Sequence, residues 1–561
     1  MNLIPAIRKS PLLPAILAVY WLAAVSGCSS INARAPYLSL TPEESLRETY
    51  FDVEIPTPDG EVLAATLYQP ALAPGEQAPL IIHTHGFGAF RASGPYGLYA
   101  QFVLSGRAAV EAWRQGYWVL SYDQRGFGES GGDVLLMHPD YEVRDLSHVI
   151  DWAEAQVPRL ARKEGDPLIA TIGESYGGAV QILASMQDAR IDALVPIATW
   201  YDLADALAPL GQVKSAWTTA LVGIGTLSSG FDFGLALDYL DLLGGTLSEP
   251  AAKEFALRSP SRYCDQGQAI QADALFLQGF RDSLMPLRAG YRNWQCALGH
   301  GRDARLIAIQ DGHILPWPMQ RWSGLPLYNT QDDLVCGDTR FTAVEMILQW
   351  LDEKLREHPP QQRIPPLCVT FADDEGVVLT ELAEGGPAFE IRPTRLKLSQ
   401  SGSLEVLLSP LDQLLGWIGA DSPQPAEAQA TSGGWLRPAF IPLVNLSQPQ
   451  DMIGFPQLTL ELETDDGRGL VFVALGVRGA HNRYIDILSE QFVPIAGAGT
   501  HRVEMPAVAR QLKAGDTLVL VAQGFTAQYF LNPQGWLGFA SISGSVELPL
   551  LDSINQTQSA H

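Results

Sequence analysis

A pentapeptide of the form G-x-S-x-G constrains this chain more than any other feature. It spans residues 173–177 (GESYG), between an apolar run expected to be a strand (PLIATI) and an apolar run expected to be a helix (AVQILASM). The two glycines allow the tight strand-to-helix turn that exposes the hydroxyl of Ser175 at the end of the strand. The motif alone is weak, but this placement favours a nucleophilic serine over a simple glycine-rich turn.

Strand and helix patterns alternate on both sides of that motif. Buried-strand patterns (APLIIHT, GYWVLSY, DALVPIA, DALFLQG, ARLIAIQ) are separated by helical periodicities such as that of residues 141–157. This alternation is typical of a mostly parallel sheet covered by helices on both faces. A hairpin pattern (FDVEIPTPDGEVLAATLYQP) comes first, and residues 342–358 form the last expected helix. We therefore predict an α/β-hydrolase catalytic domain over residues 46–358.

Two further segments differ from this pattern. Residues 199–262 are rich in Trp, Leu and Gly and are too long for an ordinary loop, which predicts a small helical cap. After residue 358, short alternating runs such as LTLELET and DTLVLVAQG follow one another between Gly, Asp and Pro turns. Strand after strand without helical periods predicts an all-β sandwich, of the jelly-roll or galactose-binding-like type, over residues 359–552.

The first residues have the pattern of an export signal. A short positive region precedes an apolar stretch, residues 11–25, that is too short to span a membrane comfortably and is typical of a signal-peptide core. It leads into Ser-Gly-Cys28, which resembles the bacterial lipoprotein signal, whose cysteine is lipidated and becomes the new N-terminus. We expect a signal peptide over 1–27 and a tether over 28–45. The expected location is the membrane, through a lipid anchor on Cys28, in the outer membrane or facing the periplasm; the alternative is an ordinary signal peptide with Cys28 incidental.

The charge balance argues against one class of partner. The 561 residues include 37 Lys and Arg against 62 Asp and Glu, which gives a formal net charge of -25. That charge repels phosphate backbones, so nucleic acid is not expected as a partner. The oligomeric state is not predicted by any of these patterns.

Four of the five cysteines remain once Cys28 is set aside. In an oxidising compartment they allow two disulfides with three possible pairings. We favour Cys264–Cys296 and Cys336–Cys368. No spacing typical of a metal site occurs, so neither a metal nor a cofactor is expected.

A serine nucleophile needs a base oriented by an acid, and in this fold they follow in the order Ser, acid, His. Asp282 follows the strand pattern DALFLQG, and His313 follows ARLIAIQ. Asp311 is a rival acid, but it is too close in sequence to reach behind the imidazole of His313. Among the other histidines, His300 stands before the strand that leads to His313, at the wrong end of the sheet. We predict a triad of Ser175, Asp282 and His313.

Amide donors for an oxyanion hole are also expected. His85-Gly86-Phe87 follows the strand pattern PLIIHT, and Gly86 lets the backbone approach the nucleophile. The amides of Phe87 and Tyr176 are the predicted donors, with a simple glycine turn as the alternative for the first. Three aromatic residues are candidate walls of a substrate pocket: Trp200, Tyr201 and Trp317. The alternative is that they are ordinary core aromatics.

As a set, these motifs resemble those of the X-prolyl dipeptidyl-peptidase/cocaine esterase (CocE/NonD) family of serine hydrolases. The elements that carry the resemblance are the leading hairpin, YDQRGFGESGG, GESYGG, GFRDSLMP and DGH, followed by a β-rich region, over residues 50–550. The resemblance implies the triad named above, a helical cap, and a jelly roll that helps to shape the active-site entrance. Cocaine esterase-like members place a tyrosine hydroxyl in the oxyanion hole, where this sequence has His85-Gly86-Phe87, so a backbone donor is favoured.

Two functional hypotheses follow. The first is an exported serine hydrolase that cleaves ester or amide bonds of a small-molecule or peptide substrate, X-Pro dipeptides included, through an acyl-enzyme on Ser175. An X-Pro dipeptidyl-peptidase needs an anionic pocket for a free α-amine; Glu174 and Asp202 are candidates, although elbow packing and cap structure are their expected roles. The second is a surface-anchored protein that binds carbohydrate or polymer and has an inert hydrolase domain. The ordered Ser, Asp and His favour the first.

Overall fold

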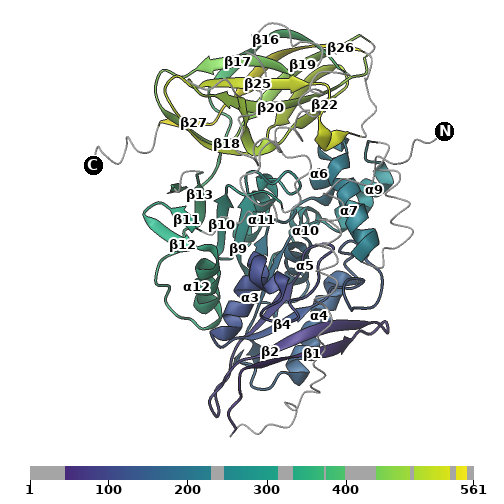
Figure 1. Ribbon diagram of the computed structural model, residues 1–561, viewed down its shortest axis with the longest axis vertical. Helices are drawn as coiled ribbons and strands as arrows, with labels where there is room; N and C mark the ends of the chain where they lie inside the picture. The colour runs from purple at the N-terminus through teal and green to yellow at the C-terminus, as the bar shows by residue number, and fades with distance from the viewer. Residues whose placement is uncertain are drawn as a thin grey trace, which may run out of the picture.

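A computed structural model describes residues 44–228, 245–313, 333–371, 375–398, 438–465, 467–480, 485–530 and 538–552. It contains a large mixed sheet with helices and, stacked on one end of it, a domain built of β-strands (Figure 1). The predicted signal peptide, Cys28 and most of the predicted tether lie outside the described residues, so these assignments stay predictions. Within the described residues, no helix is long and apolar enough to cross a membrane.

The catalytic domain is organised by a ten-stranded sheet of order β1-β2-β4-β3-β7-β8-β9-β10-β13-β14. Its strands from β4 to β13 run parallel to one another, and antiparallel pairs close both edges. The strands are β1 (Thr49–Pro56), β2 (Val62–Gln69), β3 (Leu80–Thr84), β4 (Trp118–Tyr122), β7 (Ile169–Glu174), β8 (Ala193–Ile197), β9 (Asp273–Gly279), β10 (Ala304–Ile309), β13 (Leu367–Thr370) and β14 (Gly376–Val378), with a small separate hairpin of β5 (Arg162–Lys163) and β6 (Asp166–Pro167).

The position of β13 and β14 corrects one expectation. We predicted that the β-rich domain starts at residue 359, directly after the last helix. Instead β13 pairs in parallel with β10, and β14 pairs with β13, so the catalytic sheet continues to Val378. The predicted boundary is wrong because the short strands β13 and β14 carry no pattern that distinguishes them from the strands that follow.

Helices cover both faces of the sheet, as alternation of its side chains requires. Ile81 belongs to the core beneath α3 and α12, whereas its neighbours Leu80 and Ile82 belong to the core beneath α4, α5 and α11. The helices are α2 (Leu98–Phe102), α3 (Leu104–Arg114), α4 (Glu142–Gln156), α5 (Tyr176–Ser185), α11 (Leu287–Gly299) and α12 (Ala343–Leu355).

The expected cap is helical in its described part. It consists of α6 (Leu203–Leu207), η3 (Pro209–Gly211), α7 (Ser215–Ser228), α9 (Glu249–Leu257) and α10 (Pro260–Asp265). The helix α7 also packs against η5 (Ala527–Tyr529) of the β domain. The cap therefore lies between the catalytic sheet and the β domain (Figure 1).

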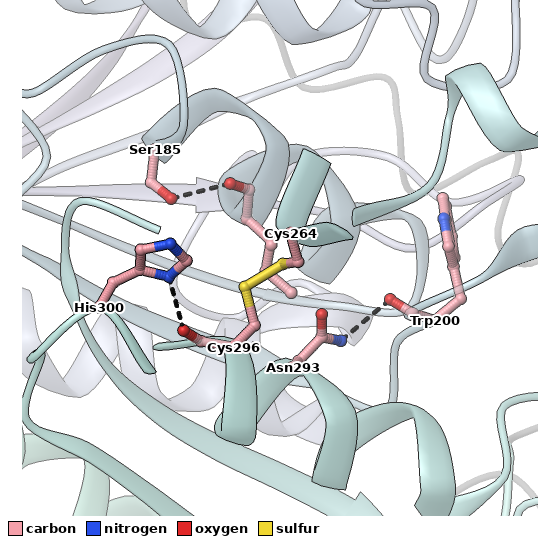
Figure 2. Close-up of a disulfide and its surroundings, with 7 residues drawn as sticks. Ser185, Trp200, Cys264, Asn293, Cys296 and His300 are labelled. Atoms are coloured by element: carbon pink, nitrogen blue, oxygen red, sulfur yellow. Dashed lines mark hydrogen bonds between the residues drawn. A yellow bond between two sulfur atoms is a disulfide. The ribbon is translucent and has the colours of Figure 1, made fainter. Parts of the chain in front are cut away.

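Both disulfides favoured from the sequence are present. Cys264–Cys296 joins α10 to α11, next to a hydrogen bond between His300 Nδ1 and the Cys296 carbonyl at 2.8 Å (Figure 2). Cys336–Cys368 joins β11 (Asp333–Cys336), which pairs with β12 (Thr339–Thr342), to β13. The first bond ties the end of the cap to the catalytic domain.

The β domain is a sandwich. One sheet has the order β16-β26-β19-β23, the other β17-β25-β20-β21 with β22 beside β20, and their apolar side chains share one core. A third sheet contains β15, β18, β24 and β27. The elements are β15 (Ala383–Glu384), β16 (Ala388–Lys397), β17 (Ala439–Asn445), β18 (Gln450–Phe455), β19 (Gln457–Thr464), β20 (Leu470–Arg478), β21 (Ile485–Ile487), η4 (Leu488–Glu490), β22 (Val493–Ala496), β23 (Gly499–Glu504), β24 (Val508–Leu512), β25 (Thr517–Gln523), β26 (Phe539–Glu547) and β27 (Leu550–Asp552).

Candidate active site

Ser175 occupies a strained turn between β7 and α5. Its backbone has φ 52° and ψ -114°. A residue other than glycine adopts this conformation only where the surrounding structure holds it there. The end of β3 packs against this turn and holds it in place. A Cβ on Gly177 would lie 2.3 Å from the Thr84 carbonyl oxygen, and one on Gly173 would lie 2.1 Å from Thr84 Oγ1. Glycine is therefore required on both sides of the serine, as the motif predicts.

The three residues of the predicted triad form one hydrogen-bonded chain. His313 Nε2 lies 3.0 Å from Ser175 Oγ, and His313 Nδ1 lies 2.7 Å from Asp282 Oδ2. Asp282 is 1% exposed, and its other oxygen accepts the amides of Leu284 and Met285 at 3.0 and 2.7 Å. The acid is thus held in place on one oxygen while the other orients the imidazole.

The strand ends explain why Asp282 rather than Asp311 meets the histidine. Because β9 and β10 are parallel neighbours, the loops that follow them lie side by side. Arg281 N donates to the Asp311 carbonyl at 3.0 Å, and a Cβ on Gly279 would lie 2.0 Å from the same oxygen. This backbone contact brings Asp282 behind the imidazole of His313.

The start of α7 in the cap touches both the acid loop and the base. The Trp217 ring meets the His313 ring edge-on, with centroids 5.7 Å apart, and Trp217 Nε1 donates to Ser283 Oγ at 3.0 Å. One turn earlier, Lys214 Nζ donates to the Leu284 carbonyl at 3.2 Å. Burial lowers the pKa of Lys214 to about 8. Sequence reasoning missed both residues, because neither the tryptophan nor the lysine belongs to a motif.

The loop after β3 lies against the nucleophile. A Cβ on Gly86 would be 3.9 Å from Ser175 Cβ. His85 Nε2 accepts the Gln124 amide at 2.9 Å, so its Nδ1 carries the proton and donates to the Gly86 carbonyl at 2.8 Å. Burial lowers the pKa of His85, in keeping with a neutral ring. Because the peptide is planar, this bond also fixes the direction of the Phe87 N–H.

Tyr176, the source of the second predicted donor, is the first residue of α5. A backbone N–H at that position has no acceptor within its own helix and is free to meet a negative charge. The structure therefore brings the residues of both predicted donors next to Ser175. Their use as an oxyanion hole stays a prediction.

Glu174 has the packing role expected of it. The Tyr99 hydroxyl donates to its carboxylate and accepts the Gly86 amide at 3.2 Å, which connects the turn that carries Ser175 to the loop after β3. Burial raises the pKa of Glu174 and that of Tyr99. Tyr99 was not identified from the sequence.

Asp202, the other acidic candidate, also has structural partners. It caps the start of α6 by accepting the Asp205 amide at 3.0 Å, and it accepts the Ser261 hydroxyl at 3.0 Å. Neither acidic residue is thus available for a substrate amine without breaking a contact.

Two of the three predicted aromatic walls lie within the described residues. Trp200 is 3% exposed, and its Nε1 donates to the Arg258 carbonyl at 2.9 Å, while its own carbonyl accepts from Asn293 (Figure 2). Tyr201 lines a cavity of about 240 Å³ beside the Cys264–Cys296 disulfide, formed largely by α10 and α11. These contacts give Trp200 a core role, whereas the pocket-wall role of Tyr201 stays a prediction. Trp317 lies outside the described residues.

Metal ligands were not expected from the sequence. In the ranges that the structure describes, no group of three or more His, Cys, Asp and Glu side chains is arranged to hold a metal ion.

The parallel sheet, the strained serine at the end of β7 and the hydrogen-bonded Ser–His–Asp chain define a class of protein, the α/β-hydrolases. Comparison with known proteins narrows the class. A family model described as X-Pro dipeptidyl-peptidase (S15 family) matches residues 59–231, which include the loop after β3, the turn that carries Ser175 and the first part of the cap.

Curated relatives match about a fifth to a quarter of the chain. An uncharacterized 31.7 kDa protein of the traX-finO intergenic region of Escherichia coli is 32% identical over 117 residues, which are 21% of this chain and 36% of that protein. An uncharacterized protein of Pseudomonas aeruginosa is 31% identical over 145 residues, 26% of this chain and 35% of that protein. The chain thus spans about a third of the length of these relatives.

Solved structures match nearly the whole chain at low identity, and so support the fold. A CocE/NonD family hydrolase from Staphylococcus aureus has a TM-score of 0.57 at 12% identity, covering 92% of this chain and 99% of that one. An α-amino acid ester hydrolase has a TM-score of 0.60 at 14% identity, covering 93% and 99%. An aminopeptidase from a marine sediment Thaumarchaeota archaeon has a TM-score of 0.58 at 12% identity, covering 93% and 99%.

Over the residues that it matches, the family model supports a serine hydrolase of the esterase or peptidase type, and the solved structures support the α/β-hydrolase fold. The resemblance noted from the motifs is confirmed.

Proposed function

We propose that this protein is an exported serine hydrolase that cleaves an ester or amide bond of a small substrate through an acyl-enzyme on Ser175. The observation that carries the proposal is the hydrogen-bonded chain from Ser175 Oγ through His313 to the buried carboxylate of Asp282. A serine hydroxyl is a poor nucleophile until a base takes its proton, and this chain supplies both the base and the group that orients it.

In the proposed reaction, Ser175 Oγ attacks the substrate carbonyl while its proton passes to His313 Nε2. The negative charge that forms on the carbonyl oxygen is stabilised by the Phe87 and Tyr176 amides, which the bonds around Gly86 and the start of α5 hold beside the serine. His313 then gives its proton to the leaving group, and the acyl-enzyme is left. Water, deprotonated by His313, attacks the acyl group, and release of the acid restores Ser175.

An ester substrate is favoured over an X-Pro peptide. Recognition of a free α-amine requires a carboxylate facing the substrate. Glu174 bonds Tyr99, and Asp202 caps α6 and bonds Ser261, so both acidic candidates have other partners. A substrate whose acyl part is neutral needs no such carboxylate.

A turnover screen tests the proposal. The full chain is assayed with Ala-Pro-nitroanilide and with nitrophenyl esters of short and medium acyl length, beside the Ser175→Ala variant. We expect ester turnover that disappears in the variant. Turnover of Ala-Pro-nitroanilide in preference to the esters would contradict the ester assignment. Failure of wild type on every substrate would instead favour the binding-protein hypothesis.

The location is proposed from the sequence, and the two disulfides support it because such bonds persist in oxidising compartments. We expect the wild type to fractionate with membranes and to label with a palmitate analogue, and Cys28→Ala to lose both properties. A Cys28→Ala protein that still fractionates with membranes would contradict the lipid anchor.

A further inference from the structure

The residues directly before Asp282 are bonded to the β domain. Gln491 Nε2 donates to the Phe280 carbonyl at 3.0 Å, at a sequence separation of 211 residues. The Arg281 guanidinium forms an ion pair with Glu490. Gln491 is 7% exposed and Phe280 is 1% exposed, so the bond between them is shielded from water, and removing its donor leaves a buried carbonyl without that partner.

The β-domain turn that makes these bonds is itself strained. Ser489 and Glu490 in η4 have φ angles of 58° and 54°, in the left-handed region that non-glycine residues rarely adopt. The Ser489 hydroxyl donates to the Ala507 carbonyl, and Gln528 Nε2 donates to the Glu490 carbonyl at 2.8 Å. Strain of this kind persists only where neighbouring structure fixes it. Here the neighbouring structure fixes a turn that faces the acid loop.

Arg281, just before the acid, also contacts the loop that carries His313. Arg281 N donates to the Asp311 carbonyl, and Gly312 packs so closely that a Cβ there would lie 2.8 Å from the Arg281 carbonyl oxygen. A shift of Arg281 therefore moves Asp282 relative to His313. Glu490 of the β-domain turn thus binds Arg281, the residue that connects the loop of Asp282 to the loop of His313.

We propose that Glu490 and Gln491 are positioning residues that set the place of Asp282 against His313, so that the β domain acts on the chemical step. The inference rests on the proposed function, since it concerns the Ser175 triad. It differs from the expectation that this domain shapes the entrance to the site. An entrance acts on substrate binding, whereas Glu490 and Gln491 bond the two residues that precede the acid.

The proposal predicts an effect on kcat with little effect on KM. Misplacing a catalytic group by about 1 Å costs up to about 10²-fold in rate. We expect Q491L and E490Q each to lower kcat about 10-fold or more, with KM within about twofold of wild type. The rate at which a fluorophosphonate labels Ser175 should fall in parallel, because it reports activation of the nucleophile.

A matched control exists in the same interface. Arg288 of α11 forms ion pairs with Glu504 and Glu384 of the β domain, and its guanidinium lies 3.7 Å from the centroid of the Phe455 ring. This contact joins the same two domains without touching the acid loop. E504Q should therefore leave kcat within about twofold of wild type, even where it lowers stability as much as E490Q does.

The experiment compares wild type, S175A, E490Q, Q491L and E504Q as full-length proteins. It measures kcat and KM on a nitrophenyl ester, the fluorophosphonate labelling rate, and urea unfolding. The expected result is a loss of kcat in E490Q and Q491L that E504Q does not share at comparable stability. If Q491L fails to fold, E490Q decides, because it keeps the size of the side chain.

Two results would overturn the inference alone. One is an unchanged kcat in E490Q and Q491L beside an inactive S175A. The other is an equal loss of kcat in E504Q, which would mean that these bonds act through stability. A wild type that neither turns over esters nor labels would overturn the proposed function, and the inference with it.

Discussion

The loop that carries Ser175 and the loop that carries Asp282 solve the same problem in different ways. Each must hold one polar side chain at the end of a parallel strand. The serine turn is fixed locally, because its two glycines pack closely against Thr84. A Cβ on either glycine would lie within 2.5 Å of Thr84. The acid loop is fixed from outside, by Lys214 and Trp217 of the cap and by Gln491 of the β domain. Local geometry makes the first robust, whereas the second depends on how three regions of the chain pack.

The largest expected effect concerns the acid itself. Asp282→Asn should lower kcat about 10⁴-fold, because an amide holds the imidazole in the wrong tautomer. Asp311→Asn is the matched control, since the Asp311 backbone carbonyl, which accepts from Arg281, is kept in the variant, and it should change kcat by less than about threefold. Steady-state kinetics on a nitrophenyl ester measures both. A large loss in Asp311→Asn beside a mild one in Asp282→Asn would reassign the acid.

The next effect tests whether the elbow is fixed locally. Gly177→Ala should destabilise the protein by about 3 kcal/mol, because its Cβ would lie 2.3 Å from a backbone oxygen that cannot move freely. Gly86→Ala, whose Cβ would meet nothing nearer than 3.7 Å, should fold with almost wild-type stability. Urea unfolding measures the difference. Equal stability of the two variants would show that the elbow tolerates a side chain.

Lys214 gives the acid loop a dependence on pH. Its pKa is about 8 in the folded chain, against an ordinary value of 10.5, so between these values the unfolded chain keeps a proton that the folded chain has lost. Lowering the pH through this window therefore favours unfolding. Relative to Lys214→Met, the wild type should gain about 2–3 kcal/mol of stability as the pH rises from 7.5 to 10.

Lys354→Met is the control for this prediction. Burial lowers the pKa of Lys354, but hydrogen bonds to Asp273 and Asp303 outweigh it and raise the pKa. Its contribution should therefore not grow over the same window. Urea unfolding at several pH values measures both variants, and a Lys214→Met difference that stays constant with pH would contradict a depressed pKa.

The smallest expected effect concerns the contact between the cap and the base. Trp217→Phe removes the donor to Ser283 but keeps a ring beside His313, so kcat should fall about 5- to 10-fold, as expected for one lost hydrogen bond. Trp294→Phe removes a similar bond, to the Ala304 carbonyl, away from the triad. It should alter stability but not kcat. An equal loss of kcat in Trp217→Phe and Trp294→Phe would contradict a specific effect of the α7 contact on the catalytic base.

The same comparison explains what sequence reasoning found. The elbow, the strand order and the Asp282 and His313 strand ends follow from short-range patterns, because glycine geometry and side-chain alternation are local. Trp217, Lys214, Glu490 and Gln491 reach the site through contacts between distant segments, and a single sequence contains no signal for them. Tyr201 lines a cavity formed largely by α10 and α11, and its use as a wall of the substrate pocket stays a prediction.

The central claim is that Ser175 is a nucleophile activated by His313. The most direct test is to incubate the full-length protein with a fluorophosphonate and to locate the adduct by peptide mass spectrometry. The account predicts one stoichiometric adduct on the peptide that contains Ser175, absent in Ser175→Ala and formed far more slowly in His313→Ala. An unlabelled wild type, or an adduct that persists in Ser175→Ala, would contradict it.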